Sequence, residues 1–237
     1  MFNRRVKEIR HSSAGFTIIE LMIAISVLAT ILLLVSVGII QISKTYYKGI
    51  TQANTQQKAR EIMDTVTQSI QFGNFTTVSS ASASLSGFST QAYCIDQERF
   101  TFVSGVQKRE SLPSDATATP AHIRHALWQD DAPVGTCTAV NLSPITPVSV
   151  KGHELIGDKM RVTKFEIVHK KTVSLDCTLD LYCVSITLMY GDDDLIDEKT
   201  NPDSSNWQCK PSAGIFSGAF CAKAQLTAVV GKRLRGN

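Results

Sequence analysis

The sequence predicts an α+β protein, with one long N-terminal helix that is transmembrane in its first half and packed on an antiparallel β-sheet head. Three observations support this prediction. A 25-residue apolar segment follows a short basic leader, and apolar residues keep a helical period beyond that segment. Further along the chain, the spacing of apolar residues changes to the two-residue period of strands.

Residues 1–15 form a basic leader. It carries four basic residues against one acid, which gives it a charge of +3, equal to that of the whole chain: Arg4, Arg5, Lys7 and Arg10 against Glu8. The rest of the chain is therefore close to neutral, so its overall charge does not favour a nucleic acid as partner. Because positively charged flanks stay on the cytoplasmic side, we expect a single-pass membrane protein with its N-terminus inside and its C-terminus outside.

The apolar segment from Phe16 to Ile40 contains one charged residue, Glu20. About 20 residues of helix span the hydrocarbon core, so this segment is long enough to cross the lipid bilayer. A secretory signal has a shorter apolar core, followed by a cleavage site with small residues, and no such site occurs at residues 41–43. A carboxylate at membrane depth costs about 2.5–3.5 kcal/mol and usually marks a function.

The helix is expected to continue to Phe72. Apolar residues recur at steps of three or four in two further stretches, residues 39–53 and 59–70. No proline occurs from residue 16 to residue 72, and Gly73 with Asn74 supplies a stop signal. The second stretch lacks the sustained heptads of a coiled coil, so we expect it to pack against the protein's own sheet.

Residues 73–237 are expected to form the exported head. Alternating apolar and polar residues indicate antiparallel strands with one face on a core and one in water. These strands are expected around Phe100 and Phe102, from Val162 to Ile167, from Tyr182 to Tyr190 and from Phe220 to Val230. The serine- and alanine-rich residues 79–91 instead predict a surface loop.

All six cysteines lie in the exported part. An oxidising compartment favours up to three disulfides, and several connectivities are open. Pairing in sequence order is preferred: Cys94–Cys137, Cys177–Cys183 and Cys209–Cys221. Zinc is disfavoured because no pair has C-x2-C spacing, and free thiols remain an alternative.

The segment Gly15-Phe16-Thr17-Ile18-Ile19-Glu20-Leu21-Met22-Ile23-Ala24 closely resembles the prepilin signature of type IV pilins and type II secretion pseudopilins. The resemblance implies a pilin-like fold. It also implies that a prepilin peptidase cuts between Gly15 and Phe16 and methylates the new Phe16 amine. In the family, the acid that matches Glu20 attracts the N-terminal amine of a neighbouring subunit. The alternative is that Glu20 merely reaches the cytoplasmic interface.

Within this family, the size of the chain and the segment from Gln56 to Met63 most resemble minor pilins of the PilW/PulJ type. This resemblance implies a structural subunit that helps to start or cap a type IV pilus or a type II secretion-like filament. Its partners would be other pilins or pseudopilins, the prepilin peptidase, an inner-membrane assembly platform and membrane lipid. The alternative is a tip adhesin or DNA-capturing subunit, for which the head offers one loose cluster: His122, Arg124, His125 and Trp128.

The remaining motifs give weak signals for bound metals. His122 and His125 lie three residues apart but lack an identifiable third ligand. An acidic run could hold Ca²⁺, but it lacks the order of an EF-hand loop, so a solvated turn is preferred: Asp192, Asp193, Asp194, Asp197, Glu198 and Asp203. No nucleophile-elbow, zinc-protease or phosphate-loop motif occurs, so we expect neither enzymatic activity nor a cofactor.

Overall fold

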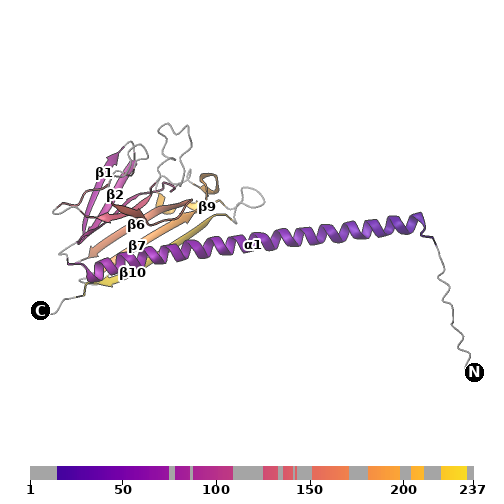
Figure 1. Cartoon of the computed structure of the whole chain (residues 1–237), viewed down its shortest axis with the longest axis horizontal. Helices are drawn as coiled ribbons and strands as arrows, with labels where there is room; N and C mark the ends of the chain where they lie inside the picture. The colour runs from indigo at the N-terminus through magenta and orange to yellow at the C-terminus, as the bar shows by residue number, and fades with distance from the viewer. Residues whose placement is uncertain are drawn as a thin grey trace, which may run out of the picture. The chain divides into compact units, whose positions relative to one another are not determined.

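The computed structural model describes residues 15–74, 78–85, 88–108, 125–132, 136–140, 142, 151–170, 181–197, 204–210 and 220–233. The chain divides into two compact units, Met1–Ser43 and Lys44–Asn237. Helix α1 (Ile18–Phe72) contributes residues to both units. The predicted layout of one long N-terminal helix with antiparallel sheets is confirmed (Figure 1).

The last part of α1 is the part that packs on the head. Its buried residues recur every three or four positions, as the sequence predicted for the second apolar stretch: Thr55, Ala59, Ile62, Met63, Val66 and Ile70. The first stretch, residues 39–53, contains no buried side chain. The helix ends where the Gly73 amide donates to the Ser69 carbonyl, at 2.9 Å. The prediction that the second stretch packs within the protein is therefore confirmed.

A three-stranded sheet lies beside this part of α1 (Figure 1). Its order is β10 (Ala222–Gly231), β7 (Leu181–Tyr190) and β6 (Met160–Lys170), and all pairs are antiparallel. These are three of the strands that the alternating residues predicted. The last strand of the chain therefore pairs with β7 at the edge nearest to the N-terminal helix.

A second, five-stranded sheet has the order β1 (Ser79–Leu85), β2 (Phe88–Ile95), β3 (Glu98–Val103), β4 (Leu127–Asp131) and β5 (Gly152–Glu154). The prediction of a surface loop at residues 79–91 was wrong, because residues 79–85 form β1 and residues 88–91 begin β2. Serine and alanine favour strands weakly, but each β1 residue pairs with a β2 residue, from Ser79 with Cys94 to Leu85 with Phe88. Pairing with a neighbouring strand has overridden intrinsic propensity.

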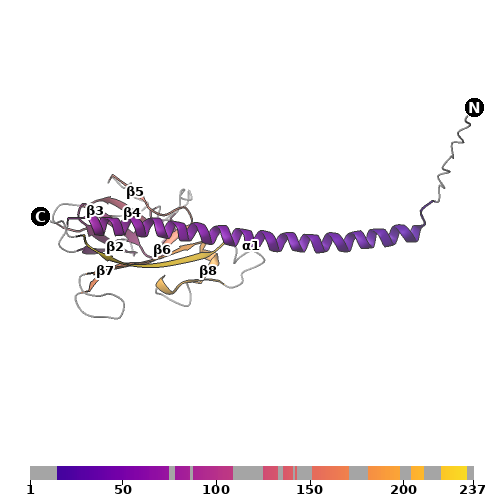
Figure 2. The same ribbon diagram turned by 90° about the horizontal axis from the view of Figure 1, so that it is seen from below.

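The main hydrophobic core contains residues of α1 and of both sheets. Figure 2 shows these elements from below. Phe165 of β6 lies at the junction, with its ring centroid 5.5 Å from Tyr93, 5.3 Å from Phe102 and 6.4 Å from Phe100. Such edge-to-face contacts are worth about 0.5–1.5 kcal/mol beyond the burial of apolar area. The aromatic cluster therefore holds the two sheets together.

Two strands are buried on both faces, which the sequence did not predict. Thr101 of β3 and Met189 of β7 lie opposite the main core, yet both are fully buried. Two smaller clusters cover these faces. One contains Val103, Val106, Trp128, Val140 and Leu142, and the other contains Met189, Ile196 and Cys221. The expectation of one wet face per strand was therefore wrong for β3 and β7.

The acidic run forms a structured turn after β7. Asp193–Leu195 make a 3-10 helix (η2). The strands β8 (Ile196–Asp197) and β9 (Gln208–Cys209) follow and pair with each other. A second 3-10 helix (η3, Ser204–Asn206) precedes β9. Asp192 pairs with Lys159 at 2.9 Å, and Asp193 pairs with the buried Arg161 at 2.6 Å. The Asp192 carboxylate raises the pKa of Lys159. Asp192 and Asp193 therefore already have cationic partners, while Glu198 and Asp203 lie outside the described residues.

The buried charge of Arg161 makes this turn structural. Asp193→Asn should destabilise the head by about 1–3 kcal/mol, because the buried Arg161 guanidinium loses this counterion. The neighbouring Asp194→Asn removes the same charge from an exposed side chain and should have little effect. The measurement is the midpoint of thermal unfolding with and without Ca²⁺. A calcium site would instead show a midpoint that Ca²⁺ raises in the parent protein and not in either variant.

Gly152 of β5 offers a second test of the packing. A Cβ atom at this position would lie 2.4 Å from the Gln129 carbonyl oxygen and 2.5 Å from the Trp128 indole nitrogen. Gly152→Ala should therefore cost about 1–3 kcal/mol of unfolding free energy, because backbone must move. Gly157→Ala is the matched control, since its Cβ would first meet the flexible Met160 side chain at 3.6 Å. Equal stability of the two variants in chemical denaturation would contradict this packing.

Candidate functional site

The N-terminal motif begins with three residues that precede the helix, Gly15, Phe16 and Thr17. Phe16 is 82% exposed, and nothing lies within 4 Å of a Cβ placed on Gly15. The peptide bond between Gly15 and Phe16 is therefore open to approach. α1 begins at Ile18, directly after this bond, so a cut there would leave the whole helix intact.

Glu20 and Thr17 form a capping box at the start of α1. The Thr17 amide and hydroxyl both donate to Oε2 of Glu20, at 3.0 and 2.8 Å. In return, the Glu20 amide donates to the Thr17 hydroxyl oxygen, at 3.3 Å. Each side chain thus satisfies an amide that the helix itself leaves without a partner. Among the described residues, Oε1 of Glu20 has no hydrogen-bond donor.

Sequence reasoning singled out Glu20 but missed Thr17. The signal was present, because Thr17-Ile18-Ile19-Glu20 matches the S/T-x-x-E pattern of a capping box before an apolar run. The structure shows that Glu20 has a local role in ordering the helix start, in addition to any role in assembly. An experiment on Glu20 must therefore separate its hydrogen bonds from its charge.

The first part of α1 has the properties of a membrane anchor. Within the described residues, α1 is the one helix that is long and apolar enough to cross a membrane. Its large apolar side chains are exposed over the whole N-terminal part, from Ile18 to Ile42. Such a surface is unfavourable in water and favourable in hydrocarbon, which contacts every side of a single helix.

Two disulfides lie wholly within the described residues of the head. Cys94 pairs with Cys137 and Cys209 pairs with Cys221, with Cα separations of 5.8 and 5.7 Å. Both pairs are among those preferred from sequence order. Cys183 is also disulfide-bonded, but Cys177 lies outside the described residues, so the pairing of these two stays a prediction. The Cys94–Cys137 bridge spans 43 residues, a separation for which the chain-entropy model gives about 4 kcal/mol.

The two described residues of the loose cluster considered as a binding patch, His125 and Trp128, pack within the head. Trp128 is 8% exposed, and its ring packs 4.6 Å from that of His125. The His125 ring nitrogen lies 3.3 Å from Glu154, which also accepts the Ala126 and Leu127 amides. His122 and Arg124 lie outside the described residues. Among the described side chains, no group of three histidine, cysteine or acidic residues is arranged to hold a metal ion.

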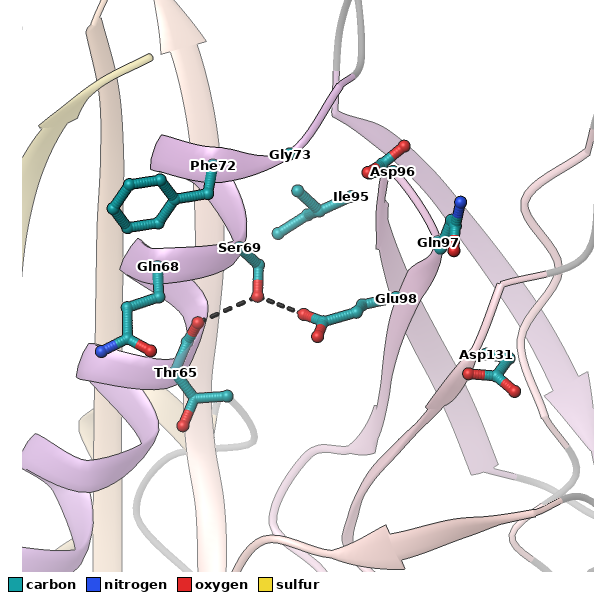
Figure 3. Close-up of a pocket in the computed structure, with 10 residues that line it drawn as sticks. All are labelled: Thr65, Gln68, Ser69, Phe72, Gly73, Ile95, Asp96, Gln97, Glu98 and Asp131. Carbon is teal, nitrogen blue, oxygen red and sulfur yellow. Dashed lines mark hydrogen bonds between the residues drawn. The ribbon is translucent and has the colours of Figure 1, made fainter. Parts of the chain in front are cut away.

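One hollow of about 460 Å³ lies between the end of α1 and the turn from β2 to β3 (Figure 3). The Ser69 hydroxyl reaches the Thr65 carbonyl at 2.9 Å and the Glu98 carboxylate. Asp96 and Asp131 add two further carboxylates to the lining, which contains no histidine, cysteine or lysine. The hydrogen bond from Ser69 to Glu98 joins the helix to the sheet beside this hollow. We assign no chemistry to the hollow.

Comparison with known families finds one match. Residues 10–36 match the model of the prokaryotic N-terminal methylation motif. The matched residues contain Gly15, Phe16, Thr17 and Glu20, and they end within the apolar part of α1. Neither the curated proteins nor the solved structures contain a match to this chain. The head is therefore described by its own structure alone.

The matched motif, the exposed apolar helix and the disulfide-bonded antiparallel head agree with one another. The motif is of the prepilin type, and it implies processing by a prepilin peptidase and assembly with other pilins. Together these features support a membrane-anchored, type IV pilin-like protein.

Proposed function

We propose that this protein is a structural minor pilin or pseudopilin that takes part in the assembly or initiation of a type IV pilus or type II secretion-like filament. The capping box at Glu20 is the observation that carries the proposal, together with the matched motif around it. Residues 1–15 are the cytoplasmic leader, residues 16–40 cross the membrane, and residues 73–237 form the exported head. Its partners are other pilins and the inner-membrane assembly platform, and it carries out no catalysis.

The capping box explains how Glu20 could serve a neighbouring subunit. Thr17 holds Oε2 and so fixes the orientation of the carboxylate, while Oε1 stays available to a further donor. Cutting after Gly15 leaves the amide and hydroxyl of Thr17 intact, so the capping box persists in the mature chain. The methylated Phe16 amine of a neighbour is cationic, and two opposite charges attract strongly at low dielectric. A mispaired subunit would leave a carboxylate alone in hydrocarbon.

Processing is the first test. The mature protein should begin at Phe16 with a methylated amine, which the intact mass of membrane-extracted protein measures directly. Replacement of Gly15 by a bulky residue should block the cut, because the peptidase has to accommodate the residue before the bond, whereas Gly15→Ala should be partly tolerated. A mature chain that starts beyond residue 40 would show that the apolar segment is a removed signal, and the proposal would fail.

The role of the Glu20 charge can be separated from its role in the cap. Glu20→Gln keeps a side-chain acceptor for the Thr17 amide but removes the charge. We expect normal membrane insertion and cleavage, with a loss of surface filaments and of co-purified pilins of about tenfold or more. The measurement is a filament count, with partner recovery, in a strain that carries only the variant chain.

Two further variants serve as controls. Glu20→Asp keeps the charge on a shorter side chain and should retain part of the assembly. Thr17→Val removes the cap and leaves the charge, so it should weaken assembly less than Glu20→Gln does. If Glu20→Gln assembled as well as the parent chain, the local cap would be the whole function of Glu20, and the proposed attraction would be wrong.

A further inference from the structure

The edge strands of the two sheets differ in whether their outward backbone amides and carbonyls have hydrogen-bond partners. At the outer edge of β10, Gln52 of α1 donates its side-chain amide to the Lys223 carbonyl at 3.1 Å. The Lys223 ammonium in turn donates to the carbonyls of Ser205 and Trp207. The helix and the η3 region therefore cover this edge, and Lys223 places a charge on it.

The first part of the outer edge of β6 is covered by the segment that follows β3. The Gly105 amide donates to the Val162 carbonyl at 2.7 Å, and the Lys108 amide donates to the Met160 carbonyl at 2.8 Å. A β-bulge between Val162 and Lys164 also breaks the regular edge. A third edge strand, β5, is only three residues long and contains Gly152. Short strands, bulges and charges are the devices by which proteins protect sheet edges.

Among the described residues, the edge strand β1 has none of these protections. Its seven residues are uncharged, contain no proline, and keep an unbroken register with β2 on one side. Within the described part of the chain, the one polar contact of β1 with a residue outside β2 is that of the Cys137 sulfur with the Ser79 carbonyl, at 3.7 Å. Ser80 and Ser82 are exposed. The outer edge of β1 thus offers backbone amides and carbonyls to an extended strand.

We propose that this edge pairs with β1 of a second copy of the chain, in antiparallel orientation, so that the two five-stranded sheets become continuous. The sequence of β1 is self-complementary for such a pair. Serines at positions 80 and 82 share one face, and alanines at positions 81 and 83 share the other. An antiparallel pairing of even with even positions sets serine opposite serine and alanine opposite alanine, and no like charges meet.

This pairing goes beyond the proposed function and is independent of it. Assembly through Glu20 acts at the start of α1, whereas pairing through β1 acts in the exported head. A failure of either proposal leaves the other standing, because the variants that test them lie in different units of the chain.

Charge swapping tests the pairing without knowledge of its exact register. Two full-length copies with different tags are co-expressed and purified in detergent. In one variant Ser80 and Ser82 are both replaced by lysine, and in the other both are replaced by glutamate. Both positions are exposed, so the single chains should fold normally.

We expect parent copies to co-purify, and the lysine–lysine and glutamate–glutamate pairs to fall by about tenfold, because like charges face each other across the strands. The lysine–glutamate combination should restore recovery to the parent level. Association through the membrane helices would be insensitive to all these changes. The proposal is overturned if parent copies do not co-purify, if the like-charged pairs are recovered normally, or if the opposite-charged pair is not restored.

Disulfide trapping gives a second measurement. Ala81→Cys and Ser82→Cys place a thiol at the middle of β1, on opposite faces, and an antiparallel pair brings one of them near its symmetry mate. At least one should give a covalent dimer on a non-reducing gel after oxidation. Gln225→Cys, on the covered strand β10, is the matched control and should stay monomeric. Equal dimer yields at all three positions would indicate random collision and would overturn the pairing.

Discussion

One helix has to be stable in two different solvents, and the rest of the structure follows from that constraint. The first part of α1 is apolar on all sides, as hydrocarbon requires, and the last part is apolar along one stripe from Ala59 to Ile70. Both sheets bury aromatic and aliphatic side chains in the same core as that stripe. The head is therefore built around a segment that is continuous with the anchor, so no linker separates the two along the chain.

The N-terminal carboxylate fits the same constraint. Glu20 lies in the first turn of α1, where the helix leaves its amides without partners, and Thr17 shares two hydrogen bonds with its carboxylate. An acid at a helix N-terminus is also favoured by the helix dipole. The cost of placing a charge near lipid is thus partly offset by the local backbone, while one oxygen remains available.

The features that the sequence predicted are those in which local pattern and packing agree. The stripe on α1 and the alternation in β6, β7 and β10 follow directly from residues such as Ile62, Val184 and Ala224, whose hydrophobicity matches their burial. The motif around Gly15 and Glu20 was readable for the same reason, since it is a short contiguous segment.

The features that were missed depend on contacts between distant residues. β1 has serine and alanine in alternation and becomes a strand because β2 supplies a partner for each position. Thr101 and Met189 are buried on the second face by residues outside their own strands, which periodicity within one strand cannot show. The acidic turn was read as solvated, because nothing in its own sequence indicates that Arg161 is buried beneath it.

The position of β10 has a consequence for the time course of biogenesis. β10 is the last strand of the chain, yet it pairs with β7 beside the first helix, and Gln52 bonds to a carbonyl 171 residues away. The Arg233 amide likewise donates to the Gln71 carbonyl at the end of α1. Contacts of such long sequence separation form late, because a large loop must close first. A chain that is still being synthesised therefore has an open core, and the head closes only after β10 becomes available to pair with β7.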